Sequence, residues 1–196
     1  LTDDDRTVIG NTTPKFSGGF GLNATFKGFD VSAFFNFMYD FDVFNANKVM
    51  MTTWASNNYN NFSMDISAAK RWRNFDDMGN EIRYSPEILA EFNKNATMWN
   101  PTSIGRPIAM SYAVEDGSFL RLKTLTLGYT LPKKVIKKWG IGNARVYVAG
   151  QNLWTISGYS GYDPEVSIRN GALTPGLDYS AYPRAYAINF GVNLGF

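Results

Sequence analysis

The side chains on which most enzymes depend are missing from this sequence. Its 196 residues include no cysteine and no histidine. This removes thiol nucleophiles, Fe–S clusters, the Ser-His-Asp triad and the usual zinc sites, and it leaves carboxylates, Lys and Tyr as the only candidates for chemistry. We therefore predict that the chain is not an enzyme and that it uses no cofactor.

Two acidic clusters could offer oxygen ligands to a calcium ion. They are Asp3-Asp-Asp5 and Tyr162-Asp163-Pro-Glu165. Neither follows the spaced pattern of an EF-hand loop, so solvated charge or turn chemistry explains them better than calcium binding does. No metal site is predicted.

The charge balance and the composition exclude further classes of protein. The chain has 19 Lys and Arg residues against 17 Asp and Glu residues, whereas a nucleic-acid-binding protein would carry a strongly basic patch. Charged residues make up only 18% of the chain, below the ~25% of an ordinary soluble domain. No stretch approaches the ~20 apolar residues of a transmembrane helix. The chain starts without Met or a signal segment, which favours a piece of a longer protein.

Long stretches alternate between apolar and polar residues with a period of two. One runs from Phe16 to Phe26, and after the turn pair Lys27-Gly28 a second runs from Phe29 to Val43. Because side chains alternate across a strand, each stretch predicts a strand with one apolar face and one mostly polar face. The two-residue turn predicts that the pair forms an antiparallel hairpin.

Three further strands are predicted later in the chain. In the first of them, Arg121 and Lys123 share their parity with Leu125, which requires a β-bulge or a change of environment. The three strands are Phe119–Leu131, Ala144–Ile156 and Tyr186–Phe196.

Two long connections, at about 44–117 and 157–182, separate the strands on one side of the sheet. The first predicts short helices near Ser67–Arg73 and Ser85–Phe92, the second of which has a Pro in its first turn. Strands of a soluble sandwich typically run ~5–6 residues, whereas membrane strands need ~9–11. Alternating short turns and long loops are typical of outer-membrane barrels. The fold class is therefore all-β, part of an antiparallel transmembrane β-barrel, with a soluble carbohydrate-binding β-module as the weaker alternative.

The barrel interpretation predicts which face of the strands contacts lipid and which face lines the lumen. Five strands cannot close a barrel, so they must complete a larger one, with the short turns on the periplasmic side. Apolar positions should face lipid and polar positions the lumen. The side chains predicted to face lipid are Phe35, Phe37, Ile188, Phe190 and Val192, and those predicted to face the lumen are Asp30, Asn36, Asn189 and Asn193.

Several ordered motifs resemble one family, the SusC/RagA-like TonB-dependent transporters of Bacteroidota. The resemblance covers nearly the whole chain except the interior of the first loop. The segments that carry it are Ser118–Pro132, Arg145–Leu153, Gly158–Val166, Gly176–Tyr179, Tyr182–Arg184 and Phe190–Phe196, together with Gly10–Phe20 and Phe26–Asp30 in the first hairpin.

The resemblance implies that residues 1–196 are the carboxyl-terminal part of the barrel domain, with the last five of 22 strands. The plug domain and the TonB-contacting segment would lie outside this sequence. Such proteins sit in the outer membrane and import oligosaccharides or peptides with energy relayed by the TonB complex, together with a SusD-like surface lipoprotein. A passive porin or a structural barrel anchor remains the alternative.

Three groups of residues are candidates for function. Asn189, Gly191, Leu194 and Phe196 match the signal read by the outer-membrane assembly machinery, although a plain last strand would also end apolar. Trp54, Tyr59, Trp72, Tyr162 and Asp163 are candidate loop contacts to substrate or to the lipoprotein lid, with packing within the loop as the alternative. Lys133, Lys134, Lys137 and Lys138 with Trp139 form a basic turn, for which a lipid-headgroup or solubilising role is the plain interpretation.

Overall fold

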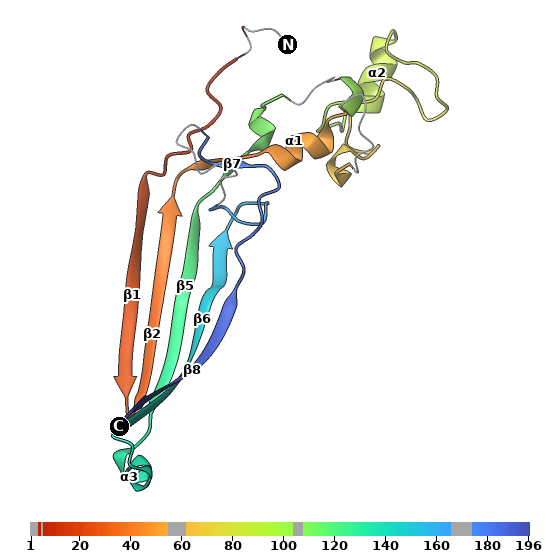
Figure 1. Cartoon of the computed structure of the whole chain (residues 1–196). Helices are drawn as coiled ribbons and strands as arrows, with labels where there is room; N and C mark the ends of the chain where they lie inside the picture. The colour runs from red at the N-terminus through yellow and green to blue at the C-terminus, as the bar shows by residue number, and fades with distance from the viewer. Residues whose placement is uncertain (1–3, 5, 55–61, 104–107, 166–173) are drawn as a thin grey trace. The chain divides into compact units, whose positions relative to one another are not determined.

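The computed structural model describes residue 4 and residues 6–54, 62–103, 108–165 and 174–196 (Figure 1). The chain divides into two compact units, which we call the sheet unit (Leu1–Val43 with Glu115–Phe196) and the loop unit (Phe44–Val114). None of the described helices combines the length and the apolar character needed to cross a membrane.

Five long strands build the sheet unit, as the alternation predicts (Figure 1). Each pairs antiparallel with its neighbour, in the order β1-β2-β5-β6-β8. The strands are β1 (Phe16–Phe26), β2 (Phe29–Tyr39), β5 (Phe119–Thr130), β6 (Asn143–Ser157) and β8 (Ala187–Gly195).

The first hairpin turns as predicted. Lys27 has φ +48° and Gly28 has φ +90°. Positive φ at both central residues is the requirement of a type I′ turn, whose twist matches that of the flanking strands. The register runs without interruption from Phe26 opposite Phe29 to Phe16 opposite Tyr39.

The predicted second strand is too long, and its extension to Val43 is wrong. β2 ends at Tyr39 because Asp40 turns the chain with φ +58°. The chain then continues as β3 (Asp42–Asn45) in a separate small sheet of order β4-β3-β7, with β4 (Val114–Asp116) and β7 (Leu177–Asp178).

Apolar alternation continues past the break at Asp40 for a different reason. Phe41 and Val43 are buried with Phe119 and Tyr159 in a small hydrophobic core. The rings of Phe41 and Phe119 meet edge to face, with centroids 6.5 Å apart. The same period-two pattern thus describes burial in protein after Asp40 and exposure of a sheet face before it.

The predicted β-bulge lies at Lys123. The register of β5 against β2 skips this residue, so Arg121 lies opposite Asn36 whereas Leu125 lies opposite Ala33. Directly opposite residues share a face of the sheet. Arg121 therefore belongs to the polar face and Leu125 to the apolar face, which resolves their shared parity in the sequence.

The two faces are continuous across all five strands. One cross-strand row is Ala24, Val31, Leu127, Val148 and Phe190, and the adjacent row on the other face is Thr25, Asp30, Gly128, Tyr147 and Gly191. Side chains of the apolar face are widely exposed, with Phe190 at 83% and Val192 at 62%. The division into two faces agrees with the sequence, and the assignment of the faces to lipid and lumen stays a prediction.

The loop unit contains short helices. The predicted helix near Ser85–Phe92 is confirmed as α2 (Pro86–Asn93), but the one near Ser67–Arg73 is wrong. There the chain forms η2 (Met64–Ile66) and a turn, and the Trp72 amide then donates to the carbonyl of Met98 at 2.8 Å. The remaining helices are α1 (Ala46–Thr52), η3 (Pro101–Ser103) and η4 (Ser111–Ala113).

Candidate functional site

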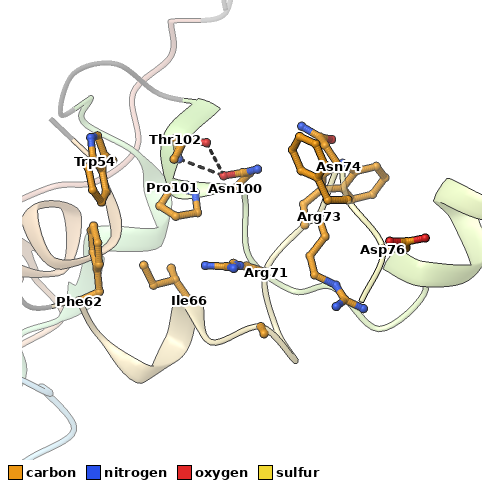
Figure 2. Close-up of a pocket in the computed structure, with 13 residues that line it drawn as sticks. Trp54, Phe62, Ile66, Arg71, Arg73, Asn74, Asp76, Asn100, Pro101 and Thr102 are labelled. Atoms are coloured by element: carbon orange, nitrogen blue, oxygen red, sulfur yellow. Dashed lines mark hydrogen bonds between the residues drawn. The ribbon is translucent and has the colours of Figure 1, made fainter. Parts of the chain in front are cut away.

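A groove of about 370 Å³ lies within the loop unit (Figure 2). Its walls combine aromatic rings with charged and amide side chains. The lining includes Trp54, Phe62, Trp72, Arg71, Asp76 and Asn100. Two of the loop aromatics proposed from the sequence, Trp54 and Trp72, thus line the same groove. The third, Tyr59, lies outside the described residues.

Trp54 is held at the groove by its backbone and by a ring contact. Its amide donates to the carbonyl of Pro101 at 3.0 Å. Its indole stacks on Phe62 with ring centroids 5.7 Å apart and an interplanar angle of 27° (Figure 2). The indole keeps 46% of its surface exposed, so one aromatic surface stays accessible to a ligand.

The segment that carries Trp72 is fixed by Asn93, at the end of α2. The side-chain carbonyl oxygen of Asn93 accepts a hydrogen bond from the backbone amide of Arg73 at 2.6 Å. The side-chain nitrogen of Asn93 donates to the backbone carbonyls of Arg73 and Leu89 at 2.9 and 2.8 Å. Asn93 is only 5% exposed. The sequence offers no signal for this positioning role beyond a lone Asn at a helix end.

The polar groups of the groove carry both signs of charge. Among the described residues, Arg71 forms no ion pair with a carboxylate. Asp76 accepts hydrogen bonds from the side chain and backbone of Asn80, at 2.9 and 2.7 Å, and these lower the pKa of the carboxyl below its ordinary value. Aromatic surface beside hydrogen-bonding groups suits a polar polymer such as an oligosaccharide or a peptide.

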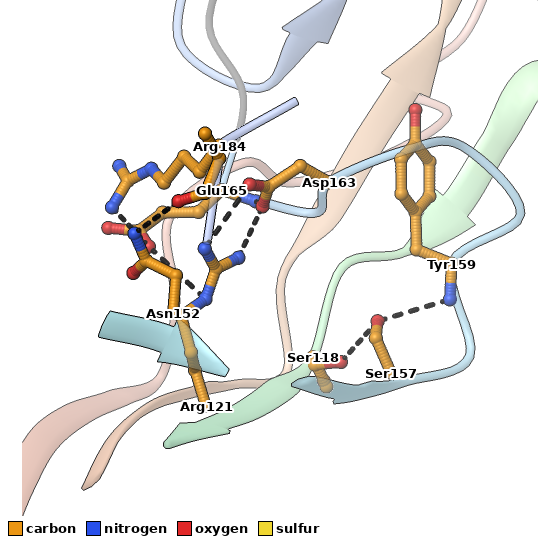
Figure 3. Close-up of polar contacts among 9 residues, drawn as sticks. Ser118, Arg121, Asn152, Ser157, Tyr159, Asp163, Glu165 and Arg184 are labelled. Atoms are coloured by element: carbon orange, nitrogen blue, oxygen red, sulfur yellow. Dashed lines mark hydrogen bonds and ion pairs between the residues drawn. The ribbon is translucent and has the colours of Figure 1, made fainter. Parts of the chain in front are cut away.

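Asp163 is the acidic candidate in the connection at about 157–182, which we call the second loop, and it is not available to a ligand. Its carboxylate forms a bidentate ion pair with Arg121 at 2.5 and 3.2 Å (Figure 3). The two residues are 4% and 2% exposed. Burial alone would raise the pKa of Asp163, but the hydrogen bonds from Arg121 and from the Glu165 amide outweigh it and lower the pKa. Tyr162, by contrast, is 83% exposed.

A second ion pair extends this buried cluster. Arg184 contacts Glu165 at 2.9 Å, and the Arg121 Nε lies 3.9 Å from the same carboxylate (Figure 3). Four charges of alternating sign thus join β5 to the segment that follows β6 and to the segment that precedes β8. The sequence indicates that Arg121 is out of phase with its strand, but it gives no sign of the ion pair with Asp163.

Tyr159 adds a polar contact inside the second loop. Its hydroxyl donates to Asp178 at 2.6 Å, and burial together with that carboxylate raises the pKa of the tyrosine. The Ser160 hydroxyl and amide both donate to Glu115 at 2.9 Å. These contacts fold the described part of the second loop onto the sheet unit.

The proposed assembly residues lie on β8 and just after it. β8 pairs with β6 on one side, and no described strand pairs with its other side. Leu194 is 51% and Phe196 94% exposed, and Asn189 is also exposed. Gly191 has a local role as well, because a Cβ at this position would overlap the ring of Tyr147.

An ion pair crosses β5 on the polar face. Arg145 on β6 donates to the Asp30 carboxylate on β2 at 2.9 and 2.5 Å. Gly128 lies between them on β5, where a Cβ would occupy the space used by both side chains. The Arg145 guanidinium also lies 5.1 Å from the ring centroid of Tyr147.

The acidic cluster at the start of the chain contributes no described geometry. Asp3 and Asp5 lie outside the described residues, as does Val166 at the end of the Gly158–Val166 motif.

No protein-family model matches the chain. Curated relatives do. A TonB-dependent receptor, P3, of Formosa agariphila is 34% identical over the whole chain, and the TonB-dependent receptor SusC of Bacteroides thetaiotaomicron is 33% identical over 77% of it. The chain spans 18% and 15% of the lengths of these two relatives, respectively.

Solved structures give the same result. A structure of the RagAB peptide transporter matches the whole chain with a TM-score of 0.73 and 27% identity, and the chain covers 19% of it. The RagAB peptide importer in the closed-closed state matches with a TM-score of 0.74 and 24% identity, also over the whole chain.

Fold and sequence together define a segment of a TonB-dependent receptor β-barrel. Within that class, the chain belongs with the SusC/RagA-like transporters, of which it represents about a fifth. The relatives are named as receptors and transporters and not as enzymes. The 22-strand count and the boundaries of the domain stay predictions.

Proposed function

We propose that this chain is part of an outer-membrane TonB-dependent active transporter that imports oligosaccharides or peptides together with a SusD-like lipoprotein. The observation that carries the proposal is a five-stranded antiparallel sheet with one continuous apolar face and one continuous polar face. A sheet of this kind suits a wall between lipid and a polar lumen. The similarity to TonB-dependent receptors over the whole chain supports the same conclusion.

The groove of the loop unit supports a polymeric nutrient as the substrate. Trp54 and Trp72 offer aromatic surface, and Arg71, Asp76 and Asn100 offer hydrogen-bonding groups of both kinds. These features fit sugar rings and peptide side chains alike. One structural relative, RagAB, is named as a peptide transporter, and this name supports a peptide as one of the two choices.

Uptake by cells that produce the full-length protein tests this proposal. Labelled oligosaccharides and labelled peptides are supplied separately, with TonB present or deleted. We expect saturable uptake of one of the two classes, with loss of that uptake when TonB is absent. Uptake that persists without TonB would instead support the alternative of a passive porin.

Two further measurements test the lipoprotein partner and the alternative of a soluble β-module. Purification of the full-length protein in mild detergent should retain a lipid-modified surface protein, and its reproducible absence would contradict the SusD-like partner. Production of residues 1–196 alone, without detergent, tests the soluble β-module. A folded monomer under those conditions would overturn the barrel, because the apolar face would then need no lipid.

A further inference from the structure

We propose that the connection between β5 and β6 is a binding site for the phosphate groups of anionic phospholipids. The inference rests on the proposed outer-membrane location. The site comprises α3 (Lys133–Ile136) and η5 (Lys137–Trp139), and Figure 1 shows α3 at the same end of the sheet as the carboxyl terminus. We call residues 26–31, 128–145 and 190–196 the turn end of the sheet.

Hydrogen bonds join the segments of the turn end. The Thr130 amide donates to the carbonyl of Gly28 at 2.8 Å, and the Gly142 amide donates to the carbonyl of Gly195 at 2.8 Å. The first hairpin, the β5–β6 connection and the end of β8 therefore lie together at the same end of the strands.

Charge is distributed very unevenly over the chain. The turn end holds six of the 19 basic residues but only one of the 17 acidic residues. That acidic residue, Asp30, is engaged by Arg145 in the bidentate ion pair across β5. A surface with this excess of cations attracts anions, and the attraction falls with salt.

The five lysines of the turn end are open to solvent. Among the described residues, none of them forms an ion pair, and all are exposed. Lys27 lies over the ring of Phe26, 5.1 Å from its centroid. The other lysines are Lys133, Lys134, Lys137 and Lys138. Their ammonium groups are therefore free to bind an external anion.

The connection presents these lysines on a fixed support. Ile136 is only 1% exposed and anchors the helical turn to the sheet unit, and Gly140, with φ +70°, ends it. Val135 in α3 and Trp139 in η5 are 47% and 68% exposed, so the connection also presents apolar and aromatic surface. A fixed turn with cations and an exposed Trp has the composition of a membrane-interface anchor.

Neighbouring aromatic residues favour lipid over a soluble acidic partner. Phe26 is 70%, Phe29 59% and Phe196 94% exposed, and all three lie in the turn end. Phe26 lies opposite Phe29, and Phe29 lies opposite Tyr129, so the apolar face continues to the last residue pair of the first hairpin. A soluble acidic protein would need the cations but not this exposed apolar surface, whereas a phospholipid leaflet matches both.

Mass spectrometry of the intact full-length protein tests the site. The protein is purified in neutral detergent with phosphatidylglycerol or phosphatidylcholine, and the lipids that remain bound are counted. We expect the wild type to retain phosphatidylglycerol preferentially. The variant with Lys133, Lys134, Lys137 and Lys138 all changed to Gln should lose at least half of that preference. Inorganic phosphate at the same concentration should not displace the lipid.

Matched variants separate the site from general loss of charge. Changing Lys15, Lys48, Lys70 and Lys94 to Gln removes four charges elsewhere and should leave lipid retention unchanged. The double variant Lys134→Gln/Lys138→Gln should show an intermediate loss, and it serves if the quadruple variant does not fold. The proposal is wrong if retention is equal in all variants, or if the lysines affect uptake without affecting retention, which would indicate a protein partner. Because retention requires neither substrate nor TonB, its failure is distinct from failure of the proposed transport.

Discussion

The sheet unit and the loop unit use their apolar residues in opposite ways. In the five long strands, the only buried apolar side chains among the described residues are Phe119 and Ala144, whereas large side chains such as Phe190 are exposed. In the loop unit, Val49, Ile66 and Ile82 are buried although the segment has little regular structure. The described residues of this chain therefore leave the apolar face of the sheet uncovered, whereas the loop unit buries apolar side chains of its own.

Hydrogen bonds show the same contrast. The five long strands are joined by continuous backbone ladders, while in the loop unit side chains bonded to backbone or to other side chains hold short segments together. The indole of Trp99 donates to the carbonyl of Thr52 at 3.2 Å, and the hydroxyl of Tyr112 donates to Asp65 at 3.2 Å. Single substitutions in the sheet unit should therefore change assembly or stability, whereas exposed groove residues of the loop unit should change ligand contact.

The largest difference between the units should come from Phe196→Asp in the full-length protein. We predict a several-fold loss of protein in the outer membrane, because the exposed end of β8 is proposed as the surface that the assembly machinery reads. Quantification of outer-membrane protein measures this effect. Trp72→Ala, in the loop unit, is the control and should leave the amount unchanged. Normal levels of Phe196→Asp would remove the assembly role.

Arg121→Met should cost about 3–5 kcal/mol, because it leaves the Asp163 carboxylate buried without its partner. The double variant Arg121→Met/Asp163→Leu should recover most of this loss, since a buried ion pair can often be replaced by apolar residues. Unfolding of the full barrel in detergent measures both variants. A double variant as unstable as the single one would contradict this account of the cluster.

The same cluster should respond to acid. The pKa of Asp163 is lowered in the folded chain from its ordinary value of 3.8. Its ion pair therefore contributes fully above that ordinary value, and the contribution is lost as the pH falls through the lower native value. The protection of the amides of residues 158–165 against hydrogen exchange, corrected for the intrinsic exchange rate at each pH, should fall over that acidic range. In Arg121→Met, the exchange should be fast already at neutral pH.

Phe190→Arg and Asn189→Arg compare the two faces of one strand. At a lipid-facing midplane position, Arg should cost about 2–4 kcal/mol, and the same change at Asn189 should be far milder because its side chain lies on the polar face. Reversible unfolding in lipid gives both values. Equal destabilisation would contradict the assignment of the faces to lipid and lumen.

The smallest effect should follow from the groove of the loop unit. Trp54→Ala removes one aromatic surface, which is worth on the order of 1 kcal/mol in a ring contact, so the half-saturation concentration for uptake should rise about fivefold. Trp54→Phe keeps a ring and should show a smaller change. Surface levels should stay constant in both, and unchanged uptake would indicate that the indole only packs against Phe62.

The strands were predictable because one rule, alternation across the sheet, governs long stretches of residues. The rule also located the bulge at Lys123, since Arg121 is out of phase with Leu125. It failed at Asp40, because residues that face a protein core alternate in the same way as residues that face lipid. Nothing local distinguishes the two environments.

The site was predictable only in part, because long-range contacts decide it. Trp54 and Trp72 were identified by residue type, but their common groove depends on Pro101, Met98 and Asn93, which are distant in the sequence. The sequence makes Asp163 a candidate loop contact to substrate or lid, with packing within the loop as the alternative. Its partner Arg121 lies 42 positions away, so only the folded chain shows that the charge is neutralised.

Gly128 lies on β5 beneath the ion pair between Asp30 and Arg145, and it affects the register in which the strands pair. A slip of two residues keeps every side chain on its original face, so the alternation of faces cannot prevent it. Such a slip would replace Gly128 by Thr126 or Thr130 beneath Asp30 and Arg145. Either threonine would fill the space that the two charged groups need in order to meet. One missing side chain thus gives the correct alignment an advantage that neither hydrogen bonds nor hydrophobicity supplies.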